Sequence, residues 1–138
     1  MSFEKALSMV KPGGVIWLKG GKYSFDKTIV INNSNNGSDG MYKTVASVPG
    51  EEAVFDFSKL SVSDSNRGIV LDGDWWHFYG IRIQYAGDNG MLLSGNNNCI
   101  EKCIFCNNQD SGLQVSRYAS TSSKAEWPSY NLIKNCTA

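Results

Sequence analysis

Residues 68–93 decide the fold and read GIVLDGDWWHFYGIRIQYAGDNGMLL; residues 94–115 continue as SGNNNCIEKCIFCNNQDSGLQV. In this stretch glycine recurs at one constant interval, at Gly68, Gly90 and Gly112, which defines a 22-residue period. A fixed period of this length is typical of a solenoid, in which each repeat forms one coil that stacks on the next. We therefore expect stacked coils rather than independent strands.

Apolar residues fall into columns when the repeats are superposed, and an 11-residue insertion within residues 118–129 only delays the match in the last repeat. Stacking of like residues on like is what a right-handed parallel β-helix needs, because no coil buries its apolar face alone. An all-β fold of this kind is favoured over a β-sandwich of short strands, which even spacing alone would also allow. The columns are Ile69, Met91 and Leu113; Leu71, Leu93 and Val115; Phe78, Ile100 and Ile133; Ile81, Cys103 and Cys136; and Ile83 and Phe105.

The N-terminal segment is predicted to be a short capping helix. Residues 2–10, SFEKALSMV, place their apolar side chains on one face, and Ser2 can cap the helix. Such a helix would cover the open end of the first coil. We expect one domain over residues 1–138, with coils from residue 14 to residue 138 and the 22-residue period from Gly68.

The residues between the helix and the repeats are predicted to form short strands. Residues 15–19 and 28–31 are rich in β-formers, with a turn at Gly20 and Gly21 between them. Residues 42–58 contain two more strands around the turn of Pro49 and Gly50.

Composition limits the classes of partner. The formal charge is zero at pH 7, with 13 basic and 13 acidic residues, so no net field favours nucleic acid or an acidic membrane surface. No apolar run reaches membrane-spanning length, and the start, MSFEKALSMVKPGG, has no signal-peptide core. We expect a monomer without nucleic-acid or membrane partners.

The cysteines give the sharpest local pattern. Cys99, Cys103 and Cys106 have the C-x₃-C-x₂-C spacing of the cluster-binding loop of radical SAM enzymes, where three thiolates hold an iron–sulfur cluster. The alternative is favoured, because Cys103 and Cys136 share an apolar column and such thiols behave as small buried hydrophobes. His77 is the single histidine, in an aromatic run before a strand, and is interpreted as a packed or surface residue.

Asp88 and Asp110 stand two residues before a repeat glycine. Stacked one coil apart, they would lie about 5 Å from each other, the spacing of neighbouring strands. Carboxylates that close repel one another unless a cation or hydrogen bonds compensate. Turn chemistry explains Asp88, whereas Asp110 stays open as a candidate substrate-binding residue.

The insertion or its edge carries the other candidate substrate-binding residues, Arg117, Lys124 and Trp127. A guanidinium can form two hydrogen bonds to a carboxylate, and an indole can stack on a sugar ring. A basic pair with an aromatic on a loop beside a parallel sheet therefore suits an acidic sugar polymer. The alternative is a solvated loop with Trp127 folded down as a plug.

Several blocks, in order, resemble the N-terminal part of the catalytic domain of family nine pectate lyases. They are PGEEAVFDFS, GIVLDGDWWHFYGIRIQYAGDNGMLLSG, CIEKCIFCNNQDSGLQVSRY and WPSYNLIKNC. The resemblance implies a right-handed parallel β-helix and calcium-dependent β-elimination on polygalacturonate (pectin) outside the cell. In that family a lysine removes the proton at C5 of a galacturonate, and clustered aspartates hold the calcium.

The chain departs from the family in one respect. The family's calcium motifs and the lysine base are expected beyond Ala138, so no catalytic residue and no metal ligand of this chain is assigned, and Asp110 can only flank the site. We expect a fragment that is inactive alone, from a secreted parent enzyme. The alternative function is a non-catalytic β-helix that binds carbohydrate or serves as an adhesin.

Overall fold

The computed structural model describes residues 1–118 and 123–138. It contains the helix α1 (Phe3–Met9), a short 3₁₀ helix η1 (Lys124–Glu126) and the strands β1 to β13. The strand bounds are β1 Val15–Leu18, β2 Gly21–Ser24, β3 Ile29–Ile31, β4 Lys43–Ser47, β5 Ala53–Asp56, β6 Ile69–Leu71, β7 Trp76–Tyr79, β8 Ile81–Gln84, β9 Met91–Leu93, β10 Cys99–Glu101, β11 Ile104–Cys106, β12 Leu113–Val115 and β13 Leu132–Lys134.

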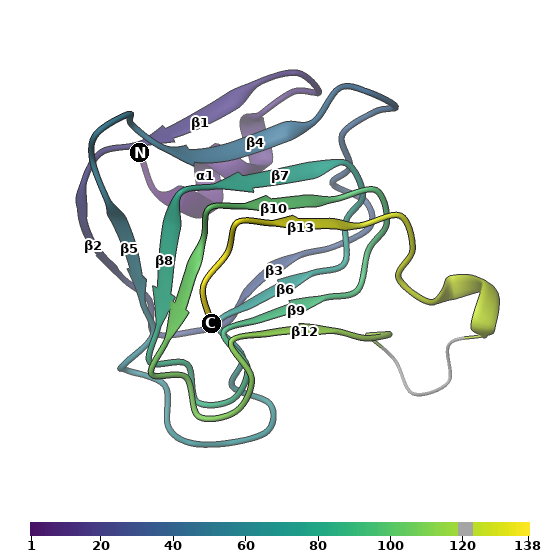
Figure 1. The fold of residues 1–138 in the computed structure, drawn as a ribbon. Helices are drawn as coiled ribbons and strands as arrows, with labels where there is room; N and C mark the ends of the chain where they lie inside the picture. Colours follow the sequence, from purple (N-terminus) through teal and green to yellow (C-terminus); the bar gives the residue numbers. More distant parts are fainter. Residues whose placement is uncertain (119–122) are drawn as a thin grey trace.

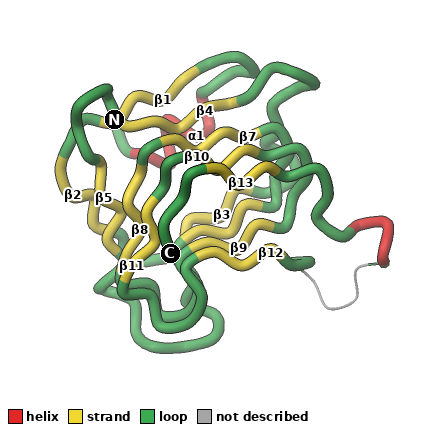
Figure 2. Tube along the Cα trace, in the orientation of Figure 1, coloured by secondary structure: helices red, strands yellow, loops and turns green. Residues whose placement is uncertain are grey.

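The strands form three parallel sheets that wrap around one core (Figure 1). Sheet A has the order β1-β4-β7-β10-β13, sheet B the order β11-β8-β5-β2, and sheet C the order β12-β9-β6-β3. Each complete coil gives one strand to each sheet, and the coils lie above one another in Figure 2. The right-handed parallel β-helix is therefore confirmed, and the β-sandwich is excluded because the pairs of named strands are parallel.

The register confirms the predicted columns. Ile69 pairs with Met91 and Met91 with Leu113, each partner lying one repeat further along the chain. Across the insertion Ile100 pairs with Ile133, so the longer connection leaves the stacking intact.

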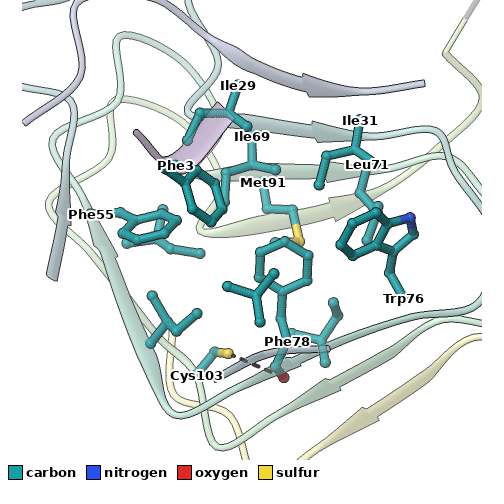
Figure 3. Packing of buried hydrophobic residues seen from close by; sticks show 14 of the residues in the cluster. Phe3, Ile29, Ile31, Phe55, Ile69, Leu71, Trp76, Phe78, Met91 and Cys103 are labelled. Atoms are coloured by element: carbon teal, nitrogen blue, oxygen red, sulfur yellow. Dashed lines mark hydrogen bonds between the residues drawn. The ribbon is translucent and has the colours of Figure 1, made fainter. Parts of the chain in front are cut away.

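One apolar core fills the inside of the coils. Its side chains include Phe55, Trp76, Phe78 and Met91, all fully buried (Figure 3). Burial of a side chain of this size stabilises the fold by about 1.5–3 kcal/mol relative to exposure.

The predicted capping helix is confirmed as α1. The Ser2 hydroxyl accepts a hydrogen bond from the amide of Lys5, which satisfies one of the free donors at the helix start. Phe3 lies edge-on to Phe55 with ring centroids 4.9 Å apart, and Leu7 is buried in the same core. The helix thus closes the core beside the first coil.

The repeat glycines are required by close packing between coils. A Cβ on Gly68 would lie 2.6 Å from the carbonyl oxygen of Gly90, and a Cβ on Gly90 would lie 2.6 Å from that of Gly112. Real Cβ atoms essentially never come within 3.0 Å of such an atom. The Cα of each repeat glycine therefore packs directly against the backbone of the next coil, which leaves no room for a side chain.

Asparagine side chains, one buried and one half-buried, form a ladder of hydrogen bonds between coils. The side chain of Asn98 accepts a hydrogen bond from the amide of Trp76 (2.7 Å) and donates one to the carbonyl of Gly73 (2.9 Å). Asn131 repeats the pattern one coil later, with the amide of Asn98 and the carbonyl of Gly95. These side chains satisfy backbone groups at corners where no strand ladder reaches them.

Asp56 is a buried carboxylate at the end of β5. Burial acts to raise its pKa, but hydrogen bonds from the hydroxyl and amide of Ser58 and from the side-chain amide of Gln84 outweigh this. The pKa of Asp56 therefore lies below its ordinary value.

Three columns of left-handed residues turn the corners, with φ between 52° and 67°. Left-handed backbone is unfavourable for most side chains, so stacked corners favour glycine and asparagine. Bulky residues nonetheless occupy several of these positions. The columns are Trp75, Asn97 and Tyr130; Gly80, Lys102 and Asn135; and Tyr85 and Asn107.

One sequence-based expectation about strands was wrong and another was incomplete. Gly20 and Gly21 do not form the whole connection between the first two strands predicted, because Gly21 begins β2, which pairs with β5. The aromatic run around His77 does precede a strand, β8, but it was not expected to be a strand itself, and Trp76–Tyr79 forms β7. In both cases pairing with the neighbouring coil decides the conformation. Among the described residues no helix is long and apolar enough to span a membrane.

Candidate functional site

The connection between β12 and β13 projects away from the coils (Figure 1). Part of it, residues 119–122, lies outside the described residues. The described part includes η1, where the side chain of Glu126 accepts a hydrogen bond from the amide of Ser123 (2.7 Å). Ser129 then connects the loop to the stacked coils, because its amide donates a hydrogen bond to the side chain of Asn96 (2.9 Å).

Arg117 and Trp127 lie together on this loop. The guanidinium carbon of Arg117 lies 5.6 Å from the centroid of the Trp127 ring, within the range of a cation–π contact. The indole stays 43% exposed, so it is not a buried plug. Within residues 1–118 and 123–138, no carboxylate lies within 4.0 Å of the cations of Arg117 or Lys124. The loop therefore presents two cations and an aromatic face to solvent.

Asp110 lies apart from these residues. It is exposed in the turn before β12, whereas Arg117 follows the other end of that strand. Its amide donates to the carbonyl of Asp88 (3.3 Å), which confirms that the two aspartates occupy stacked positions. The structure brings Arg117 and Trp127 together but does not place Asp110 with them.

The carboxylates of this turn region do not fit a calcium site. The side chain of Asp88 lies 3.4 Å from the guanidinium of Arg67 and accepts a hydrogen bond from Asn89 (3.1 Å). Calcium needs six to eight oxygen ligands gathered around one point. Asp88 is instead compensated by a cation of the protein, as expected for a structural turn.

The end of the chain belongs to the same stack of coils. Thr137 forms an isolated parallel bridge with Ile104 of β11, and Ala138 is exposed beside the corner at Gly112. A Cβ on Gly112 would lie 3.1 Å from the Cβ of Ala138. The expectation of a lysine base and calcium ligands beyond Ala138 stays a prediction.

The three cysteines of the cluster-like pattern do not converge. Cys103 is fully buried in the core (Figure 3) and donates a hydrogen bond to the carbonyl of Phe78 (3.7 Å), whereas Cys106 lies by Arg82 on the outside of sheet B. Cys99 lies on β10 beside His77. Since an iron–sulfur cluster needs its thiolates around one point, the radical SAM interpretation fails and the buried-thiol interpretation of Cys103 is confirmed.

Cys103 and Cys136 affect each other's ionisation. The interaction with the neighbouring Cys136 thiol, together with burial, raises the pKa of Cys103. The interaction with Cys103 lowers the pKa of Cys136, because the less buried of the two thiols is the one that ionises first. Cys136 is therefore the more nucleophilic of the two thiols at neutral pH.

His77 belongs to a half-buried polar group on the outer face of sheet A. Its Nε2 lies 3.1 Å from a carboxylate oxygen of Glu101, and the other oxygen of Glu101 lies 3.5 Å from the ammonium of Lys134. From the sequence, His77 and Cys99 were considered separately and Glu101 was not considered. The repeat could have shown that His77 and Cys99 stack, because they are one 22-residue period apart.

Comparison with known proteins gives consistent similarities. The family model described as the Pel9A-like right-handed β-helix region matches residues 1–138. Pectate lyase L of Paenibacillus polymyxa (strain SC2) is 43% identical over 132 residues, which cover 96% of this chain and 29% of that protein. Pectate lyase L of Dickeya dadantii (strain 3937) is 33% identical over 146 residues, covering 100% of this chain and 32% of the relative.

The fold matches a solved structure equally well. The crystal structure of pectate lyase Pel9A superposes with a TM-score of 0.81 at 33% identity. The match covers 99% of this chain and 33% of the solved one. The chain thus spans about a third or less of the length of these relatives.

Proposed function

Since the chain belongs to the family of Pel9A-like right-handed β-helix proteins, we propose that it is a segment of a polysaccharide lyase acting on polygalacturonate. The observation that carries this proposal is the match of the whole chain to proteins named pectate lyase. A segment of this kind would serve outside the cell, where polymeric pectin is found.

The β12–β13 loop is proposed to hold the polymer. A galacturonate carboxylate would take two hydrogen bonds from the guanidinium of Arg117, and Lys124 would add a second positive charge. The exposed part of the Trp127 indole offers an apolar face to a sugar ring. The contact between Arg117 and Trp127 supports this role, because it holds both groups in one orientation before the substrate arrives.

The chemical step is assigned to other parts of the family fold. Calcium, which the resemblance implies, would acidify the C5 proton of the bound galacturonate. The turn aspartates of this chain do not form a calcium site, so we assign to its residues only substrate binding and orientation. Asp110 would line the approach to the site from the opposite end of β12.

A second candidate is a non-catalytic β-helix that binds carbohydrate. Two solvent-facing cations beside an exposed indole suit binding without cleavage, because the one close group of three potential metal ligands among the described residues includes no residue of this loop. Both candidates predict that the loop binds an acidic polymer. They differ in whether products form.

A chimera distinguishes them. The matching segment of the Paenibacillus pectate lyase L, 43% identical, is replaced by this chain. The lyase proposal predicts unsaturated products from polygalacturonate, detected by their ultraviolet absorbance, and a higher KM when Arg117→Gln is added. A folded chimera that binds the polymer without forming products would instead support the binding module. A folded chimera that does neither would contradict both.

A further inference from the structure

Three potential metal ligands from two neighbouring strands meet on the outer face of sheet A. His77 of β7 and Cys99 of β10 are direct partners in the parallel ladder, and Glu101 follows Cys99 on the same face. One ligand atom from each residue lies within 4.8 Å of the other two. Among the described residues this is the one group of three such side chains so close together.

The donor set determines which cation fits. One imidazole nitrogen, one thiolate and one carboxylate match the ligands of Zn²⁺, which binds them at about 2.0–2.3 Å in tetrahedral geometry. Those bond lengths put the donors roughly 3.3–3.6 Å apart. Nε2 of His77 and the nearer oxygen of Glu101 are already 3.1 Å apart, and the Cys99 thiol, which lies within 4.8 Å of both ligand atoms, would have to approach by at most about 1.5 Å. Calcium and magnesium are excluded here because they prefer all-oxygen shells.

The surroundings suit a neutral, half-buried site. The side chains of His77 and Glu101 are 24% and 18% exposed, and Cys99 is 9% exposed. A divalent cation with one thiolate and one carboxylate carries no net charge, which limits the desolvation cost. The rings of Tyr42 and Tyr79 lie 6.0 Å and 5.8 Å from that of His77 and hold the imidazole in place.

Lys134 is the competing cation. Its ammonium lies 3.5 Å from the second oxygen of Glu101, and its side chain is 54% exposed, so it can swing into solvent. Without a metal, Lys134 and His77 share the negative charge of Glu101. A metal ion would displace this arrangement, and Lys134 would then weaken its binding by charge repulsion.

We propose that His77, Cys99 and Glu101 form a binding site for Zn²⁺ that fastens β7 to β10. With three protein ligands, the fourth position of the tetrahedron stays open to water or to an anionic oxygen. Metal held by the native strands and not by the unfolded chain stabilises the coil stack. The site is independent of the β12–β13 loop and of the proposed lyase function.

The test measures binding of Zn²⁺ to the chain by titration calorimetry, after chelator treatment and with the thiols kept reduced. Co²⁺ serves as the spectroscopic probe, because a thiolate ligand gives a charge-transfer band and tetrahedral geometry gives intense visible bands. We expect one ion per chain, a thiolate band and a metal-dependent rise in melting temperature. Cys99→Ser and His77→Gln should each weaken binding about 100-fold or more, beyond the 10–100-fold typical of groups that only support ligands.

Matched variants keep the outcome clear. Cys106→Ser and Cys136→Ser each remove a thiol that does not belong to the proposed site. Both variants should keep the Zn²⁺ affinity within about twofold of the wild type, because neither thiol is a ligand. Lys134→Gln should tighten binding roughly tenfold at low salt and less at high salt. Chelator-treated variants are first checked for the native melting transition, which shows that loss of binding is not loss of fold.

The proposal is overturned by any of three results. The first is the absence of Zn²⁺ binding to the folded chain. The second is binding that Cys99→Ser leaves unchanged, and the third is binding that disappears with Cys136→Ser or Cys106→Ser, since the site would then lie elsewhere.

Discussion

Replacing Gly90 by alanine tests why glycine recurs in every repeat. The added Cβ would lie 2.6 Å from the carbonyl oxygen of Gly112 and 2.6 Å from the side-chain nitrogen of Asn108. Hydrogen bonds hold both the Gly112 carbonyl and the Asn108 side chain in place. The Gly112 carbonyl accepts the amide of Met91 (3.0 Å), and the Asn108 side chain accepts the amide of Ala86 (3.0 Å).

The magnitude follows from these contacts. Overpacking against fixed atoms costs about 1–3 kcal/mol. Weakening one or two buried hydrogen bonds adds about 1 kcal/mol each. We therefore expect Gly90→Ala to lower the free energy of unfolding by about 2–5 kcal/mol, a large part of the 5–15 kcal/mol typical of a domain. The melting temperature should fall by roughly 6–20 °C.

The assay is urea unfolding followed by far-ultraviolet circular dichroism, with Gly20→Ala as the matched control. A Cβ on Gly20 would lie 3.1 Å from the Cβ of Glu51 and 3.4 Å from the amide nitrogen of Glu52, in an exposed loop, which is a much milder contact than the two at 2.6 Å around Gly90. That variant should stay within about 1 kcal/mol of the wild type. The close-packing explanation is refuted if the two variants are equally stable.

Three further predictions concern stability and reactivity. Asn98→Ala should lower the free energy of unfolding by about 2–5 kcal/mol in the same assay, because it leaves two buried backbone groups unpaired, and the half-buried Asn131→Ala should cost less. The depressed pKa of Asp56 stabilises the fold fully above the ordinary value of 3.8, and this contribution disappears as the pH falls through the lower folded-state value. Melting temperatures from pH 5 to pH 2 should therefore decline more steeply in the wild type than in Asp56→Asn, and parallel curves would contradict this. Iodoacetamide at pH 7 should alkylate Cys136 well before Cys103, as peptide mass mapping would show; the reverse order would contradict the assigned ionisation.

The sequence predicts the stacking of the later coils, but for the earlier coils it predicts only strands. From Gly68 onward the 22-residue period is regular and shows which residues stack. Before Gly68, loops of different length separate partners, so the interval from Ile29 to its partner Ile69 is much longer than that from Val15 to its partner Thr44. Such unequal intervals hide a repeat, so the β-rich residues of β1, β3, β4 and β5 mark strands without showing how they pair.

The corners show a different limit. Asn97 and Asn107 are the residue type expected at left-handed positions, but Trp75, Tyr85 and Lys102 occupy equivalent ones. The neighbouring coils impose this left-handed conformation, so it cannot be predicted from the backbone preferences of these residue types.

The candidate sites were only partly predictable. The sequence places Arg117 and Trp127 on one loop, but their contact depends on the path of that loop. His77 and Cys99 share a column by simple counting, yet His77 was expected before a strand and not within it. Glu101 joins them only because Cys99 and Glu101 point to the same side of β10.

Binding of polygalacturonate to the chain tests the proposed function most directly. Titration calorimetry at low salt compares the wild type with Arg117→Gln and with Lys59→Gln, which removes a positive charge from an exposed residue of another loop. The proposal predicts binding that Arg117→Gln weakens about tenfold, as expected for the loss of a charge-assisted pair, while Lys59→Gln stays within about twofold. No binding to polygalacturonate, or equal binding of a neutral galactan, would contradict it.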